Sequence, residues 1–473
     1  MLVMKFGGTS VGDATRFASV AQIIREAKSR DEQVVVVVSA MSGVTNSLIR
    51  AARAAAEGDE ATCRRIGEEL LTLHRDTCEA LIAHAGERRD VCWFIEDRLR
   101  DVERFCRSLT VLRELTVRGQ DAVSSIGEKL SAHILAAHLR EQGTRAQAVD
   151  ATEIIVTDDN FGAANPLMTE TRERVRWKLL PLLEQGIVPI LTGYIGATAE
   201  GVTTTLGRGG SDYTAAIVGA CLDADEVWIW TDVDGILTAD PNIVSQARPL
   251  RELSYVEAAE LACFGAEVLH PKTIKPLEER GIPLRIVNSF NPTDPGTLIV
   301  KKPQRTPRHV QAIISTKGLS LIGVAGNGDA WTPEVAARAL SRLAREGVDV
   351  LMFTQSFSER QLNLLVRQGD MEHGLKALQR EFQGELERGV IARLGVQYPV
   401  ATISVVGGPG EDGLGIVPKT FAALGKHQTK VISIAQASLE YNVSFVVTED
   451  QVDSTVRLIH EELGLGNFNA PPL

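Results

Sequence analysis

The stretch TLGRGGSDYTA, residues 205–215, sets one arginine among glycines, directly before a serine and an aspartate. Glycines let bare backbone amides come close to a ligand, and Ser211 or Asp212 could cap a helix that begins here. A fixed cation beside exposed amides and a helix N-terminus suits an anion. The chemistry predicted for Arg208 is therefore the binding of a carboxylate.

A second group of residues has the character of a phosphate site. Lys5 precedes Gly7 and Gly8, which supplies a point charge and close-approach amides for phosphate oxygens. Phosphoryl transfer needs cations and amides around the transferred group, and an ionised carboxylate can accept that group without a general base. Each stretch alone is also typical of an ordinary turn or cap. Similar polar loops follow three further apolar runs, at residues 39–46, 193–196 and 231–235.

These loops need a scaffold that brings them together. Short apolar runs alternate with helical patterns through the first 300 residues, which predicts a three-layer αβα sandwich with a mainly parallel sheet. Asp13 should cap the first helix, residues 47–118 should form an antiparallel helical pair, and residues 121–142 a further helix. Ligands of such sheets bind outside the carboxyl ends of the strands, so the loops should line one crevice. The predicted strands are Val3–Phe6, Val34–Val38, Ile187–Leu191 and Val227–Trp230.

The C-terminal third contains an internal repeat. Residues 343–366 and 424–447 align without a gap at an offset of 81, and each copy reads as helix, strand, turn, strand, helix. This predicts two small α+β (ferredoxin-like) modules. We expect a first domain at 1–300, a linker at 301–310, a first module at 311–395 and a second at 396–473.

The composition disfavours several classes of function. The 473 residues are 44% hydrophobic and 23% charged, which is typical of a globular protein. A formal net charge of −11 disfavours binding to nucleic acid or to an anionic membrane. The six cysteines form no CxxC pair, which predicts packing residues, no structural zinc and a reducing compartment. No apolar run reaches the roughly 20 residues of a membrane span, and the N-terminus lacks a signal-peptide pattern, so we expect a cytoplasmic protein.

Seven motifs in a fixed order give the chain a specific resemblance to aspartokinases, which belong to the amino acid kinase fold family. The two C-terminal modules resemble the paired ACT domains of those enzymes. This resemblance implies that the second module is nested within the first, so that the C-terminal end completes the first module. No homoserine dehydrogenase domain follows, so the chain is similar to the monofunctional form. The resemblance implies ATP-dependent phosphorylation of the β-carboxylate of L-aspartate, the first step toward lysine, threonine, methionine and isoleucine. The motifs are KFGGTSV (5–11), SAMSGVTN (39–46), SIGEKLSA (125–132), GYIG (193–196), GRGGSDYTA (207–215), TDVDGI (231–236) and FGAEVLHPKT (264–273).

The resemblance also implies roles for matching residues. Aspartate would be bound by Thr45, Glu128, Arg208 and Ser211, with Glu128 suited to the ammonium and Arg208 to the α-carboxylate. Lys5 and Asp212 are the implied catalytic residues, because Lys5 would hold the terminal phosphates and Asp212 would orient it. Magnesium would arrive with ATP, and no metal ligand of the protein is implied. The implied nucleotide-binding residues are Lys5, Gly7, Gly8, Ser39, Thr231, Asp232 and Asp234.

Paired ACT modules imply feedback inhibition by an amino acid, lysine or threonine, bound at the interface of the modules. They also imply assembly into a homodimer or homotetramer. The candidate effector residues are Asn327, Asp329, Gln355 and Gln436. The side chain of Gln355 could equally hydrogen-bond to backbone groups at the end of a strand.

Three positions depart from the commonest pattern of the family on the nucleotide side, and two other functions stay open. Leu237, Asn242 and Glu267 replace the residues usual there, so they are not assigned as ligands, and a loss of activity is an alternative.

The chain could be another amino acid kinase, acting on glutamate, N-acetylglutamate or a nucleoside monophosphate. It could also be a non-catalytic amino acid sensor that keeps the kinase fold as a scaffold.

Overall fold

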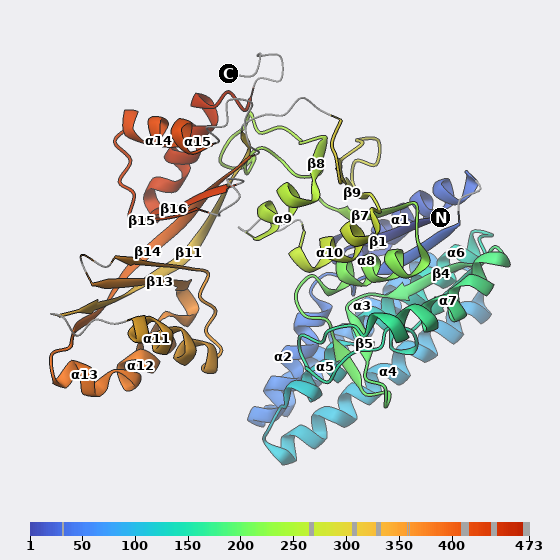
Figure 1. Ribbon diagram of the computed structural model, residues 1–473. Coiled ribbons are helices and arrows are strands. Elements are labelled where there is room, and N and C mark those ends of the chain that lie inside the picture. The colour runs from blue at the N-terminus through green and yellow to red at the C-terminus, as the bar shows by residue number, and fades with distance from the viewer. Residues whose placement is uncertain are drawn as a thin grey trace. The chain divides into compact units, whose positions relative to one another are not determined.

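The computed structural model describes residues 1–30, 33–263, 269–304, 310–327, 333–356, 358, 360–407, 416–436 and 442–466. The chain folds into two compact units, each visible in Figure 1. The first comprises residues 1–236, 251–259 and 267–304, and the second comprises 237–250, 260–266 and 305–473. This differs from the single boundary expected near residue 300, because two short segments from before that boundary pack with the C-terminal part.

The first unit is built on a sheet whose strands include all four apolar runs that the sequence predicted. β2 is five consecutive valines, all buried, as expected for a strand covered on both faces. The strands are β1 (Leu2–Phe6), β2 (Val34–Val38), β3 (Ala146–Val149), β4 (Val188–Thr192), β7 (Glu226–Thr231), β8 (Glu252–Ser254), β9 (Leu284–Asn288) and β10 (Thr297–Val300), with a separate hairpin of β5 (Ile195–Ala197) and β6 (Thr203–Thr205).

The helices of the first unit agree with the predicted pattern except in the segment that follows the second strand. Residues 47–118 contain more than the expected pair, and the helix expected at 121–142 is interrupted at Ser125. Asp13 caps the first helix as predicted, accepting a hydrogen bond of 2.9 Å from the Arg16 amide. The helices are α1 (Ala14–Ser29), α2 (Val44–Glu57), α3 (Glu60–Leu81), α4 (Ala85–Leu112), α5 (Val117–Ser124), α6 (Ile126–Glu141), α7 (Met168–Glu184), α8 (Gly210–Leu222), α9 (Tyr255–Cys263) and α10 (Pro271–Arg280).

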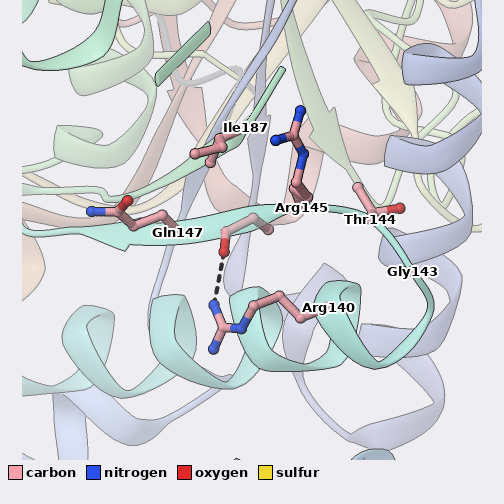
Figure 2. A pocket seen from close by; sticks show the side chains of 7 residues that line it. Arg140, Gly143, Thr144, Arg145, Gln147 and Ile187 are labelled. Atoms are coloured by element: carbon pink, nitrogen blue, oxygen red, sulfur yellow. Dashed lines mark hydrogen bonds between the residues drawn. The ribbon is translucent and has the colours of Figure 1, made fainter. Parts of the chain in front are cut away.

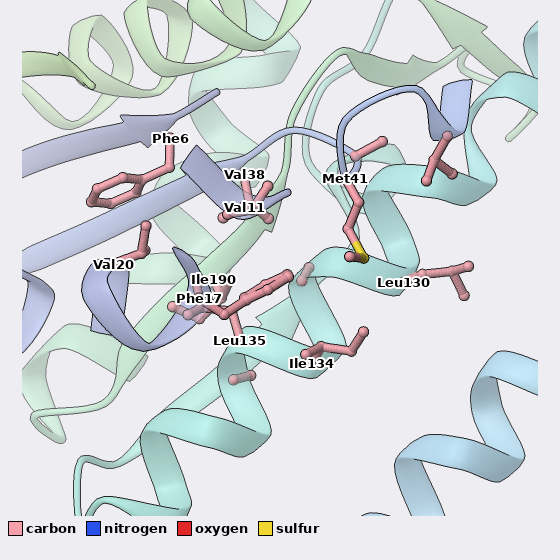
Figure 3. Close-up of a cluster of buried hydrophobic side chains, with 14 of the residues drawn as sticks. Phe6, Val11, Phe17, Val20, Val38, Met41, Leu130, Ile134, Leu135 and Ile190 are labelled. Carbon is pink, nitrogen blue, oxygen red and sulfur yellow. The ribbon is translucent and has the colours of Figure 1, made fainter. Parts of the chain in front are cut away.

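The strand order is β3-β4-β2-β1-β7-β9-β10-β8, and the first six of these strands are parallel. β10 pairs antiparallel with β9 and parallel with β8. On one face, Phe6 packs with Phe17 of α1 and Leu135 of α6 in the main hydrophobic core (Figure 3). Helices α7 and α8 contact the other face. The predicted three-layer arrangement is therefore confirmed.

The second unit contains a six-stranded antiparallel sheet in the order β12-β13-β11-β14-β16-β15. The internal repeat is confirmed, since β12 and β13 recur as β15 and β16 at the predicted offset. The elements are β11 (Val310–Gly326), α11 (Pro333–Arg345), β12 (Met352–Ser356), β13 (Gln361–Arg367), α12 (Met371–Glu381), α13 (Gln383–Glu387), β14 (Ile391–Gly407), α14 (Val417–Lys426), β15 (Ser433–Gln436), β16 (Asn442–Thr448) and α15 (Val452–Glu462).

The nesting of the two modules is the reverse of the one expected. β11 and β14 are long strands that pair along both modules, and the C-terminal half of β11 pairs with β13 and the N-terminal half of β14. Residues 319–397 thus form a continuous first module. The second module takes its additional strand from residues 310–316, which pair with the C-terminal half of β14. The prediction that the C-terminal end completes the first module is wrong, because α15 packs in the core of the second.

The segment 237–250 belongs to the second unit although it directly follows a loop of the first. The Ile313 amide donates to the Thr238 carbonyl at 2.8 Å, and the Thr238 hydroxyl contacts His460 Nε2 at 3.0 Å. The Arg457 guanidinium donates to the Ile243 carbonyl at 2.7 Å. Ile243 also lies in the apolar core of the second module. The segment is therefore an integral part of this unit.

Candidate active site

The register of the sheet explains why loops from distant parts of the sequence meet. Phe6 at the end of β1 is level with Val38 of β2 and with Trp230 of β7. Their parallel direction means that the next residues leave the sheet at one edge. They line an open cavity of about 550 Å³. Seven predicted site residues line it: Gly7, Gly8, Ser39, Thr45, Glu128, Thr231 and Asp232.

The glycines after β1 differ in what they contribute. A Cβ atom on Gly8 would lie 3.0 Å from the Ala40 carbonyl oxygen, so the close approach of the two loops requires a glycine. The Gly7 amide donates a hydrogen bond of 3.2 Å to the Trp230 carbonyl. This amide is therefore engaged with the sheet in the ligand-free structure, and the binding of phosphate by Gly7 stays a prediction. Gly7 still lines the cavity.

Lys5 and Asp212 form a nearly buried ion pair. The Lys5 ammonium lies 2.5 Å from the Asp212 carboxylate, and the two side chains are 10% and 13% exposed. Lys5 is the second-last residue of β1, and Asp212 lies in the first turn of α8. The pairing that the sequence resemblance implied is present, and it holds the ammonium at the carboxyl end of the sheet. The helix cap was predicted wrongly, because Gly209, with φ of +70°, precedes the helix and Asp212 lies within it.

Glu128 is the most unusual acid of the cavity. Its side chain is buried at the start of α6, and its Oε2 atom has no hydrogen-bond partner within the described part of the chain. Burial raises the pKa of Glu128 to about 8, and hydrogen bonds from its own amide and from the Ala40 amide offset this only in part. A Cβ atom on Gly127 would lie 2.7 Å from the Ala40 side chain, which shows how closely α6 approaches the loop after β2. An ammonium group would satisfy the free oxygen.

The remaining residues of the GRGGSD loop lie outside the lining of this cavity. Arg208 is exposed. Burial, then the charge of Lys272 and then that of Arg208, lower the pKa of His270. The Asp212 charge acts in the opposite direction and raises the pKa of His270. Ser211 approaches the loop after β4, since a Cβ atom on Gly193 would lie 2.6 Å from its hydroxyl. The roles of Arg208 and Ser211 stay predictions.

The acidic residues of the loop after β7 differ in their hydrogen bonds. The Asn288 and Asn291 side-chain amides donate to Asp234 at 2.8 and 3.2 Å. The Thr231 hydroxyl donates to Asp232 at 3.2 Å. Asp234 is thus held in place by amides, while the exposed Asp232 lines the cavity, as Glu128 does.

The sequence analysis missed Asp121 on α5. Its carboxylate is buried and accepts hydrogen bonds from the Thr205 hydroxyl at 2.7 Å, the Thr205 amide at 3.1 Å and the Gly162 amide at 2.8 Å. Burial raises the pKa of Asp121, and these donors oppose that effect. Thr205 lies three residues before Arg208, so Asp121 anchors the loop that carries the arginine. A sequence signal existed, because Asp121 and Glu128 are seven residues apart, at two-turn helical spacing.

We expect Asp121→Ala to lower the free energy of unfolding by about 1–3 kcal/mol, because it leaves buried amides without an acceptor. It should also weaken the binding of any ligand of Arg208. Thermal unfolding and ligand titration would measure the two effects. Thr205→Val is the milder comparison, since it removes only the hydroxyl contact. Equal stability of wild type and Asp121→Ala would contradict the anchoring role.

The predicted effector residues lie in the second unit. Gln355 on β12 is half-buried, with an Nε2 atom that has no partner among the described residues, whereas Gln436 on β15 is exposed. The two strands are joined by a 2.8 Å contact between the hydroxyls of Thr354 and Ser433. Asn327 follows β11, and its amide donates to the Val390 carbonyl at 2.8 Å. Asp329 lies outside the described residues.

Two of the three positions that depart from the family pattern, Leu237 and Asn242, lie in the segment that follows the loop at 231–235, and their place on the nucleotide side stays a prediction. Leu237 bridges to Pro249, and the Asn242 amide donates to the Asp240 carboxylate at 2.8 Å. Both residues belong to the segment that packs in the second unit. Glu267 lies outside the described residues.

A second cavity, of about 570 Å³, opens near the amino ends of β3 and β4, away from the loops described above (Figure 2). Its lining includes Arg140 and Arg145, which would suit an anion. Arg140 donates to the Ala146 carbonyl at 2.8 Å, and Arg145 donates to the Gln185 carbonyl. Both guanidinium groups are therefore engaged in holding the backbone.

Comparison with known proteins agrees with the architecture. The sequence model of the amino acid kinase family matches residues 1–288, and that of the ACT domain matches residues 322–382 and 403–463. Aspartokinase 3, chloroplastic, from Arabidopsis thaliana is 33% identical in a match covering 97% of this chain and 80% of that protein. Bifunctional aspartokinase/homoserine dehydrogenase 2, chloroplastic, from the same plant is 33% identical, covering 98% of this chain and 50% of that protein.

Solved structures give the same result. Escherichia coli aspartokinase III in complex with aspartate and ADP (R-state) superposes with a TM-score of 0.81 at 30% identity, covering 98% of this chain and 100% of that one. The complex with lysine and aspartate (T-state) gives a TM-score of 0.80 at 30% identity, covering 98% and 99%. The fold and the loop cluster define a phosphotransferase of the amino acid kinase family. Within it, the chain belongs to the aspartokinases, with paired ACT domains.

The described residues contain neither a metal-binding cluster nor a membrane-spanning helix. No group of three or more His, Cys, Asp or Glu side chains there is arranged to hold a metal ion. Across the same ranges, no helix has both the length and the apolar character needed to cross a bilayer.

Proposed function

We propose that this chain transfers the γ-phosphoryl group of ATP to the β-carboxylate of L-aspartate, forming 4-phospho-L-aspartate and ADP. The observation that carries the proposal is the unpartnered Glu128 oxygen in the cavity lined by Gly8, Ser39 and Thr231. An amino acid ammonium would satisfy this oxygen. The same cavity has the amides and hydroxyls that a triphosphate needs. The solved relative that contains aspartate and ADP supports this pairing of ligands.

In the proposed reaction, a β-carboxylate oxygen attacks the γ-phosphorus, and the bond to the oxygen that bridges to the β-phosphate breaks. Two anions must approach each other, so the charge of Lys5 offsets their repulsion. Asp212 holds Lys5 in position through the 2.5 Å contact. Magnesium would arrive with the nucleotide, and Asp232, exposed on the cavity wall, is the carboxylate suited to a hard cation.

We also propose feedback inhibition by lysine or threonine, bound by the second unit. The solved relative that contains lysine supports an amino acid effector. Assembly into a homodimer or homotetramer, and a cytoplasmic location, stay predictions.

The direct test is an aspartyl hydroxamate assay with ATP and magnesium. We expect product with L-aspartate, and none with glutamate, N-acetylglutamate or a nucleoside monophosphate. The assay is then repeated with lysine and with threonine, one of which should inhibit. Nucleotide binding without turnover on any acceptor would contradict the proposal and favour an amino acid sensor.

Arg208→Ala should raise the KM for aspartate about ten- to a hundred-fold, because it removes charge-assisted hydrogen bonds worth about 1.5–3 kcal/mol. The kcat should change much less. Steady-state kinetics at saturating ATP would show this. Arg172→Ala is the matched control, since Arg172 pairs with Asp223 on the same unit at 2.6 Å, away from the cavity. An unchanged KM in Arg208→Ala would rule out carboxylate binding by Arg208.

A further inference from the structure

The helical hairpin of α3 and α4 carries four of the six cysteines. The ion pair between Arg75 and Glu96 fixes how its two helices face each other. In an antiparallel pair, facing residues keep a nearly constant sum of sequence numbers. The sum of the sequence numbers of Cys63 and Cys106 differs by only two from the sum for Arg75 and Glu96, so the two cysteines lie at nearly the same register. The hairpin therefore places these two cysteines opposite one another.

The pKa values of the two thiols agree with this register. The Cys106 thiol lowers the pKa of Cys63, and the Cys63 thiol together with burial raises the pKa of Cys106. Cys106 is buried in the core and Cys63 is half-buried. Both are free thiols. A pair of facing thiols differs from the isolated packing cysteines that the sequence predicted.

Cys63 is also reachable from solvent. It lines a cavity of about 290 Å³ between α2, α3 and α4, together with the apolar Ile66 and Leu99. The exposed side chains of Arg64 and Glu68 line the same cavity, so it extends to the surface. A molecule of the size of hydrogen peroxide would fit, since water occupies only about 30 Å³. Cys106 is not among the residues that line this cavity.

We propose that Cys63 and Cys106 are a redox-active dithiol, which hydrogen peroxide converts to a disulfide that ties α3 to α4. The Cys63 thiolate attacks one peroxide oxygen; an S–O bond forms, the O–O bond breaks, and the leaving hydroxide takes the thiol proton to become water. The sulfur of Cys106 then attacks the sulfenic acid. An S–S bond forms, the S–O bond breaks, and a second water leaves with the Cys106 proton. The two sulfur atoms lose two electrons, and the peroxide is reduced to two waters.

The hairpin contains its own comparison pair. Cys78 and Cys92 also face each other near the turn of the hairpin, and burial together with the nearby Cys92 raises the pKa of Cys78. Neither residue is among those that line the cavity beside Cys63. Cys63 and Cys106 should therefore be oxidised first.

The test treats the reduced full-length chain with hydrogen peroxide, blocks remaining thiols, and maps peptides without reduction. We expect a cross-linked Cys63–Cys106 peptide that dithiothreitol releases. This peptide cannot form in Cys63→Ser, and its yield should persist in the double variant Cys78→Ser/Cys92→Ser, because the nucleophile is the Cys63 thiolate. The melting temperature should rise on oxidation only where the cross-link forms.

A second variant keeps the proposal testable if Cys63→Ser fails to fold. In Cys106→Ser the sulfenic acid at Cys63 has no partner, so dimedone should label Cys63. Absence of that label would overturn the proposal. So would a peroxide-treated wild type in which Cys63 stays fully alkylatable, or one in which only Cys78 and Cys92 become linked.

Discussion

Lys5→Ala should lower kcat by about 10²- to 10³-fold, with a smaller effect on the KM for aspartate. Removing one preorganised donor from a transition state costs about this much. Lys5 is the cation at the carboxyl end of β1, held 2.5 Å from Asp212 at the edge where the loops leave the sheet. Single-turnover measurements at saturating ATP and aspartate would isolate the chemical step. Turnover close to that of wild type would show that the phosphate assignment of Lys5 is wrong.

The variant also leaves the Asp212 carboxylate without its partner in a nearly buried position, which should destabilise the fold. Activity must therefore be expressed per folded molecule, with folding followed by thermal unfolding. Lys178→Ala is a matched control, because Lys178 pairs with Glu153 at 2.6 Å on the same unit, outside the cavity. That control should keep both its stability and its kcat.

Glu128→Gln should greatly weaken the binding of aspartate, and the binding that remains should not depend on pH between about 6 and about 8. In the free wild-type protein Glu128 is largely neutral below its pKa of about 8, whereas an ammonium ligand requires the carboxylate. The KM for aspartate in wild type should therefore fall as pH rises from about 6 to about 8, approaching about tenfold per pH unit. Steady-state kinetics across this range would measure it. A flat profile would contradict the role of Glu128.

The pH dependence of the stability of the ligand-free protein is an independent test of the raised pKa of Glu128. The carboxyl pKa is 4.5 in its ordinary state and about 8 in the fold, so the folded state binds more protons between these values. The free energy of unfolding should therefore decrease as pH rises from about 4.5 to about 8, relative to Glu128→Gln. At pH 8 the variant should be the more stable protein.

Asp150→Asn is a control, because Asp150 should change the stability with pH in the direction opposite to that of Glu128. Burial opposes the ionisation of Asp150, but the charge of Lys129 and hydrogen bonds from Lys129 and Thr152 outweigh burial and lower its pKa. The contribution of Asp150 to stability is thus present near neutral pH and is lost on acidification. If both variants showed the same pH dependence, the effect could not be assigned to Glu128.

The central sheet was predictable because its signal is local. Five valines in a row at 34–38 leave little alternative to a buried strand, and a polar loop after each apolar run indicates the edge where ligands bind. The same reasoning placed Ser39, Thr45 and Thr231 in one cavity. Glycine positions were predictable for a related reason, since Gly8 must allow a 3.0 Å approach to Ala40.

The features that could not be predicted from the sequence depend on pairing between distant residues. Whether the Gly7 amide is free or donates to Trp230 is decided by strand register, which no local pattern reveals. The nesting of the two modules was reversed because either half of a long strand can pair with either neighbour. Asp121 was missed because its partners, Thr205 and Gly162, lie far along the chain.

The loop 237–250 limits how the molecule can be divided. Before it, Gly235 has φ of +98°, and the Ile236 amide donates to the Thr297 hydroxyl at 2.8 Å. After it, Arg251 is paired with Asp294 at 2.5 Å. A truncated chain ending at residue 304 would keep both anchors but strip the cover from the apolar side chains between them, among them Ile243. The first unit is thus no self-sufficient fragment, and removal of residues 305–473 would expose the apolar side chains of the segment 237–250 to solvent.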